Sequence, residues 1–470
     1  MRKPFDNGEG KNVPDLIGRF EEMLKMNSGH FFDVDEFEDI INYYLNKNNI
    51  IKAYKAVNQA IEIYPNNTIL MLKKAVIYMN KGRNELALKI IKEVIDIDPG
   101  NGDAFIIAGD IYSQKKEYKK AIENYTLALS DAEEPDEIHA SIAFEWEALG
   151  EFKKALDHLR IALALNPEND TLIYELAFCF EINEHQKEAI EYLSLYLDQN
   201  PYSAAGWFNL GNMHAGIDQY AEAIDAYEFA IAIDESFSSA YYNKANALMN
   251  LKDYEEAIKC YKETMLFEEP DSLTIFYIGE CYENLGDYEK ALKHYKRTIV
   301  SDPEFADAWM SIGAIYEEAG DFLPALEYML KSVTIDMYNP EYWHVIAETQ
   351  RKAGLIEEAI SSYQQVTTQD PHNDEAWMDL AETLVEAHRP EEATEMLRNS
   401  VPFLENHPEV IAKLFVIQYQ NGFIREAADT LLNGIKIDPE EFIECISDFP
   451  EIIADTVIAD IISSYPKKKN

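Results

Sequence analysis

Apolar residues recur at helical spacing, in short blocks separated by polar turns. In one block, Trp207, Leu210 and Gly211 follow one another at steps of three and one. After a polar turn, Ala223 and Tyr227 are four residues apart. Steps of three and four place apolar side chains on one face of an amphipathic helix. We therefore expect a helix, a turn and an antiparallel helix as the local unit.

This unit repeats every 34 residues. Alanine stands at twelve positions at this spacing, with no insertion or deletion: Ala53, Ala87, Ala121, Ala155, Ala189, Ala223, Ala257, Ala291, Ala325, Ala359, Ala393 and Ala427. A second small residue, such as Gly211 or Ala245, recurs midway along the first helix, and proline often closes the unit. Small side chains let two helix backbones approach closely. The predicted repeats are 34–67, 68–101, 102–135, 136–169, 170–203, 204–237, 238–271, 272–305, 306–339, 340–373, 374–407 and 408–441.

The two flanks look like caps. Residues 1–33 contain an apolar helical pattern over 14–26, and we expect a capping helix there. Residues 442–470 are expected to form capping helices and a short basic tail, with one helix over 451–464 and Pro402 ending the preceding repeat's second helix early. The apolar stripe from Ile453 to Ile462 either covers the last repeat or docks a partner, possible occupants including a second copy in a homodimer.

Charge restricts the classes of partner. The chain has 41 Lys and Arg against 86 Asp and Glu, a formal net charge of −45. Such acidity disfavours nucleic-acid phosphates and anionic membranes, and suits basic partners. We find no signal peptide and no apolar run of about 18 residues, so we expect a cytoplasmic protein with no membrane insertion. Four scattered cysteines, Cys179, Cys260, Cys281 and Cys445, are expected to be reduced thiols.

Catalytic motifs are missing from the sequence. It has no Gly-rich phosphate loop, no GxSxG elbow and no HExxH pair. Its ten histidines do not cluster, and no loop resembles an EF-hand. We therefore expect no enzyme, no cofactor and no metal site.

The repeat pattern resembles the tetratricopeptide repeat (TPR) family. The matching aromatic residues are Trp207, Trp309, Trp343 and Trp377, each followed three residues later by Leu or Ile, and the matching tyrosines are Tyr112, Tyr282 and Tyr316. The strict alanine, Tyr227 or Tyr295, and the closing proline complete the pattern. The resemblance implies an all-α fold, a right-handed α-solenoid of about twelve 34-residue helix-turn-helix repeats.

The resemblance also implies where a ligand would bind. In this family the first helices line a concave groove, and their second, fifth, sixth, ninth and twelfth positions face the ligand. The fifth positions carry Tyr174, Phe208, Tyr242, Phe276, Met310, His344 and Met378. The sixth and ninth positions carry Asn209, Asn243, Asn212, Asn246, Glu280, Glu348 and Glu382. The twelfth positions add Glu147, Glu181, Glu283 and Glu317.

These residues favour a protein or peptide partner. Asparagine amides can bond to a peptide backbone, aromatic rings and methionines offer apolar contact, and carboxylates select Lys or Arg. We expect a non-enzymatic scaffold or adaptor that holds an extended or helical basic segment in an acidic groove. No fifth position carries a cation, so a clamp for a partner's carboxylate is not expected. Two alternatives stay open: a self-assembling structural component, and an assembly or secretion chaperone that shields an apolar client.

Overall fold

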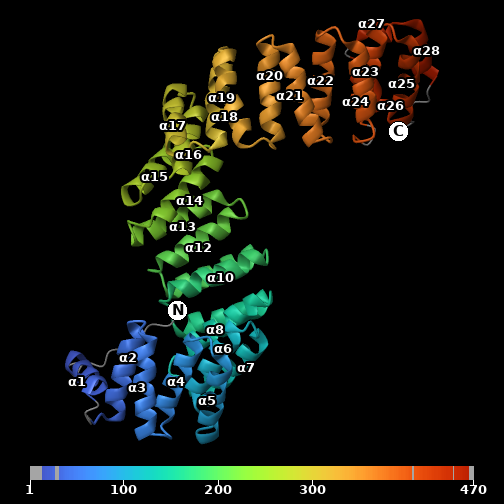
Figure 1. Cartoon of the computed structure of the whole chain (residues 1–470). Helices are drawn as coiled ribbons and strands as arrows, with labels where there is room; N and C mark the ends of the chain where they lie inside the picture. Colours follow the sequence, from blue (N-terminus) through green and yellow to red (C-terminus); the bar gives the residue numbers. More distant parts are fainter. Residues whose placement is uncertain (1–12, 27–30, 405–406, 448, 465–470) are drawn as a thin grey trace. The chain divides into compact units, whose positions relative to one another are not determined.

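The structure is a computed structural model that describes residues 13–26, 31–404, 407–447 and 449–464 (Figure 1). Every regular element in these ranges is a helix. The chain forms two compact units, residues 1–251 and 252–470, each with its own buried core. The predicted basic tail, 465–470, and residues 1–12 of the predicted N-terminal segment lie outside the described ranges.

The first unit is a succession of short helices. They are α1 (Val13–Met26), α2 (Val34–Asn46), α3 (Ile50–Ile63), α4 (Thr68–Asn80), α5 (Asn84–Ile97), α6 (Gly102–Gln114), α7 (Tyr118–Ala128), η1 (Leu129–Asp131), α8 (Pro135–Ala148), α9 (Phe152–Leu165), α10 (Asp170–Ile182), α11 (Gln186–Gln199), α12 (Ala204–Ala215), α13 (Tyr220–Ile233) and α14 (Ser238–Asn250). From α2 to α13 they pack in consecutive pairs.

The second unit continues the same pattern. Its helices are α15 (Tyr254–Phe267), α16 (Ser272–Asn284), α17 (Tyr288–Ser301), α18 (Ala306–Glu318), α19 (Phe322–Ile335), α20 (Pro340–Lys352), α21 (Ile356–Gln369), α22 (Asp374–Glu386), α23 (Pro390–Ser400), α24 (Pro408–Gln420), α25 (Ile424–Ile437), α26 (Pro439–Ile446), α27 (Pro450–Ile453) and α28 (Thr456–Ser464). From α16 to α25 they pack in consecutive pairs. The predicted all-α helix-turn-helix fold is confirmed, while the limits of the repeats stay a prediction.

Polar caps start the first helix of many pairs. Asn67, for example, accepts a hydrogen bond from the Leu70 backbone N–H at 3.0 Å, which satisfies one of the free N–H groups of α4. The same cap recurs 34 residues later at Asn101. The caps with such a bond before first helices are Asp33, Asn67, Asn101, Asn169, Ser203, Asp271, Asn339 and Asn373.

A left-handed residue ends the first helix of each pair. In the described part of the chain, twelve residues have positive φ, and they are spaced by 34. Six are glycines: Gly82, Gly150, Gly286, Gly320, Gly354 and Gly422. The other six are Asn48, Lys116, Glu184, Asp218, Lys252 and His388. At Gly286, the next N–H, that of Asp287, donates back to the Tyr282 carbonyl at 2.9 Å, so the turn closes the helix end.

The strict alanines form the close contacts between paired helices. All twelve are at most 1% exposed. Pro402 also has its predicted effect, because α23 ends at Ser400 and has 11 residues where most second helices have 14. At the N-terminal end, α1 buries Leu16, Ile17 and Phe20 against the helices that follow.

The predicted single helix over 451–464 is wrong. The chain forms α27 and α28 instead, and the break lies at Ala454 and Asp455. The Asp455 carboxylate accepts the Val457 N–H at 2.8 Å, which starts α28, and it also accepts the Tyr419 hydroxyl at 2.8 Å. These bonds stabilise the break better than a continuous helix would.

The C-terminal apolar stripe faces the chain's own core. Ile452 and Ile458 are buried, and Ile453, Ile461 and Ile462 pack against the cluster that contains Phe415 and Phe442. This arrangement agrees with a cap. The homodimer through this segment stays an untested prediction.

No helix in the described ranges has the length and apolar character needed to cross a membrane.

Candidate functional site

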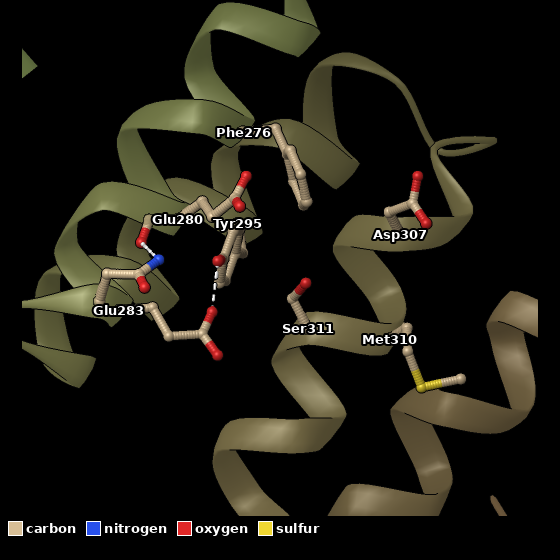
Figure 2. Close-up of a pocket in the computed structure, with 8 residues that line it drawn as sticks. Phe276, Glu280, Glu283, Tyr295, Asp307, Met310 and Ser311 are labelled. Carbon is tan, nitrogen blue, oxygen red and sulfur yellow. Dashed lines mark hydrogen bonds between the residues drawn. The ribbon is translucent and has the colours of Figure 1, made fainter. Parts of the chain in front are cut away.

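An open pocket of about 500 Å³ lies in the second unit (Figure 2). Its walls come from two first helices, α16 and α18, and its floor from the second helix between them, α17. The lining residues are Phe276, Glu280, Glu283, Asn284, Tyr295, Asp307, Met310 and Ser311. The pocket therefore combines two apolar side chains, Phe276 and Met310, with three carboxylates.

A glycine lets the tyrosine reach the pocket. Tyr295 of α17 is 1% exposed and its ring lies beneath α16 at Gly279, where a Cβ would stand 2.7 Å from Tyr295 Cε1. Only glycine leaves room for the ring at this approach. The Tyr295 hydroxyl then donates a hydrogen bond to Glu283 (Figure 2). The small position predicted from the repeat therefore positions a pocket carboxylate through its neighbour.

The same glycine–tyrosine pair occurs in the first unit. Tyr227 lies beneath Gly211 and donates to Asn212 Oδ1 at 2.8 Å. Tyr125 has the same relation to Gly109 and donates to Asp110 Oδ1 at 2.8 Å. In all three pairs, a buried tyrosine of a second helix fixes a polar side chain of the first.

The pocket carboxylates lie close together without neutralisation. No cation of the described residues is within 4.0 Å of Glu280, Glu283 or Asp307. Burial raises the pKa of Glu280, and the neighbouring charges of Glu283 and Asp307 raise it further. Burial also raises the pKa of Glu283, although the hydrogen bond from Tyr295 opposes that shift. Asp307 accepts the hydroxyl of Tyr342. The pocket is thus an array of half-buried acceptors suited to a cation.

The predicted residues nearest this pocket have different fates. Phe276, Glu280 and Met310 line it. His344 Nε2 lies 2.9 Å from Asp379 Oδ2, and this hydrogen bond raises the pKa of His344. His344 is therefore engaged within the chain.

Farther along, Glu382 already has cationic partners. Its carboxylate contacts Arg351 Nη1 at 3.3 Å and Lys413 Nζ. A charge that is neutralised within the chain has less to offer a guest. Glu348 is exposed and Met378 is half-buried against the adjoining core.

In the first unit, the predicted asparagines bond mainly to the chain. Asn243 Nδ2 donates to Asn212 Oδ1 at 2.8 Å. Asn209 is 4% exposed and donates to the Ala205 carbonyl at 2.8 Å. The placement of Asn209 toward a ligand is wrong, because its side chain is turned back into its own helix.

The remaining predicted residues of the first unit are more accessible. Tyr174 is 39% exposed, and its ring meets Phe208 edge-on at 6.3 Å between centroids. Phe208 is half-buried, as are Tyr242 and Asn246. These side chains form a surface that mixes aromatic and polar groups, but the described residues show no second pocket like that of α16 and α18 among the best formed.

Four pocket residues were missed: Asn284, Tyr295, Asp307 and Ser311. The sequence held a signal for two of them. Asp307 and Ser311 occupy the second and sixth positions of their predicted repeat, which face the ligand in the TPR family. No comparable signal marked Tyr295, because its position in the second helix is a core position.

One group of side chains has donor atoms close enough to share a metal ion. Atoms of Asp374, His407 and Glu409 all lie within 4.8 Å of one another. The three residues stand at the starts of α22 and α24, where the helix dipole opposes a cation. We assign no metal to them.

Family models described as tetratricopeptide repeat match several stretches of the chain. They cover residues 70–101, 102–130, 147–204, 204–237, 238–264, 279–340 and 350–409. The chain belongs to the tetratricopeptide repeat family. Proteins of this family generally act as protein–protein interaction scaffolds, typically without catalytic activity.

Solved structures share the fold at low sequence identity. The C-terminal part of a TPR repeat-containing protein from Cytophaga hutchinsonii is 17% identical, with a TM-score of 0.43 over 49% of this chain and 95% of that one. Yeast Tom70 is 13% identical, with a TM-score of 0.39 over 91% and 98%. YrrB, a TPR protein with an unusual peptide-binding site, is 18% identical, with a TM-score of 0.33 over 40% and 96%. No curated protein matches the chain significantly.

Proposed function

We propose that this chain is a non-enzymatic scaffold that binds a Lys- or Arg-containing segment of a partner protein and holds one cationic side chain in the α16–α18 pocket. The observation that supports this most is the set of three pocket carboxylates, Glu280, Glu283 and Asp307, with no cation within ion-pair distance. Phe276 and Met310 beside them would contact the aliphatic stem of the guest side chain.

The charges explain why a guest would stay. Like charges held together in a half-buried site repel one another, so a cation placed among them relieves the repulsion as well as gaining attraction. Two of the carboxylates are already oriented by tyrosine hydroxyls, which lowers the entropy lost on binding. A partner segment that orders on binding loses part of this gain, and we expect micromolar affinity.

Salt should weaken this interaction strongly. We expect the dissociation constant for a fluorescein-labelled peptide of alternating lysine and alanine to rise by about tenfold or more between about 50 mM and about 500 mM salt, because salt screens partly exposed charges. Fluorescence anisotropy measures it. The matched control is the same peptide with glutamine in place of lysine. Equal affinity at both salt concentrations would show that charge does not drive binding, as expected of a chaperone for apolar clients.

Acid should also weaken the interaction, at a higher pH than for ordinary carboxylates. The pKa of Glu280 and of Glu283 is raised by burial, so each carboxylate is charged above its raised pKa and loses that charge as pH falls through it. We expect affinity for the lysine–alanine peptide to fall between pH 7 and pH 5 and to recover on return to pH 7. A Glu280→Gln, Glu283→Gln variant should show a flatter pH profile, and a profile as steep as that of the unsubstituted protein would contradict the assignment.

A further inference from the structure

We infer that the α16–α18 pocket selects arginine over lysine in the partner segment, an inference that rests on the proposed function. Three features of the pocket distinguish the two cations: the placement of its acceptors, an aromatic ring at its rim, and its partial burial.

The acceptors stand on two sides of the pocket. Glu280 and Glu283 project from α16, and Asp307 and Ser311 from α18 across from them (Figure 2). Glu283 Oε2 and Asp307 Oδ1 each accept a tyrosine hydroxyl, which leaves the second oxygen of each carboxylate for a guest. A guanidinium carries five N–H donors spread in one plane, whereas an ammonium carries three on a single atom. Only the guanidinium can donate toward both sides at once.

The ring of Phe276 gives the pocket a flat aromatic surface. It is held in place by Phe305, at 4.9 Å between ring centroids, and by Tyr295, at 5.2 Å. A planar guanidinium stacks on such a ring while its edge donates to carboxylates. An ammonium has no flat face, so it cannot use the ring and the carboxylates in the same way.

Partial burial adds to this difference. Glu280 and Glu283 are only partly exposed, so a guest must lose water to reach them. A guanidinium is more weakly hydrated than an ammonium, and it loses less on entering such a site. The volume of about 500 Å³ accommodates the larger head group.

Three matched peptides test this inference on the full chain. The first is a capped alanine peptide with two arginines, the second has lysine at both positions, and the third has citrulline, which keeps the shape of arginine without its charge. By isothermal titration calorimetry at low salt, we expect the arginine peptide to bind about fivefold or more tighter than the lysine peptide. Phe276→Leu, which keeps an apolar wall but removes the ring, should narrow that ratio while circular dichroism shows an unchanged helix content.

The outcomes separate the two proposals. Equal or tighter binding of the lysine peptide overturns the arginine inference and leaves the proposed function standing. Binding of the citrulline peptide as tight as that of the arginine peptide overturns both, because charge would then play no part. Failure of both cationic peptides to bind at millimolar concentration also overturns both.

Discussion

Gly211→Ala is expected to destabilise the protein, yet the same substitution is expected to stabilise a Tyr227→Ala variant. A Cβ at residue 211 would stand 2.5 Å from Cε1 and 2.7 Å from Cδ1 of Tyr227, closer than real contacts allow. Overpacking of this kind costs about 1–3 kcal/mol, which outweighs the gain of about 1 kcal/mol in helix propensity from glycine to alanine. Without the tyrosine ring the clash disappears and the propensity gain remains.

Urea denaturation of the four proteins in this cycle measures the effect. Tyr227 is 1% exposed, so Tyr227→Ala alone should lower the free energy of unfolding by about 3–5 kcal/mol. Gly18→Ala in α1 is the matched control, because a Cβ there meets no atom within 4 Å, and it should stabilise. The packing account fails if Gly211→Ala destabilises both backgrounds equally.

Glu280→Lys is expected to abolish binding of the basic peptide and to leave the fold at least as stable. Reversing this charge puts a cation where the guest's cation would sit, and such like-charge contacts cost several kcal/mol, or about a 30-fold loss of affinity or more. In the free protein the new lysine faces Glu283 and Asp307, so attraction replaces repulsion. Anisotropy and thermal denaturation measure the two effects on the same sample.

Glu327→Lys supplies the control for this variant. Glu327 is an exposed residue of α19, outside the pocket, and its substitution changes the net charge by the same amount. Affinity should fall far less than with Glu280→Lys. If both variants lose the same affinity, the net acidity of the chain is responsible and the pocket is not.

Much of the fold was predictable because the repeat fixes it locally. A strict 34-residue spacing of Ala53, Ala87 and their successors places a small residue at every close helix contact, and the structure buries all twelve. The spacing of Trp207, Leu210 and Gly211 likewise marks one helix face, which α12 confirms. Local rules of this kind need no knowledge of distant neighbours.

The site was harder to predict because its chemistry depends on contacts between repeats. Glu382 looked like a groove carboxylate, but Arg351 and Lys413, each 31 residues away, neutralise it. Glu280 looked the same in sequence and meets only other acids. Position within a repeat places a side chain on a helix, whereas the partner that contacts it comes from the next repeat. The C-terminal break failed for the same reason, since Tyr419 lies 36 residues from Asp455.

The left-handed turn residues make the units unequal. Where this residue carries a side chain, as at Asp218 or His388, its backbone conformation costs about 1–2 kcal/mol that glycine avoids at Gly286 or Gly354. In a repeat protein each unit contributes its own stability and that of its contacts with its neighbours. Under mechanical load or heating, units that carry a side chain at this turn should open before those that carry glycine. The order of opening therefore depends on a position where the 34-residue spacing holds and the residue type does not.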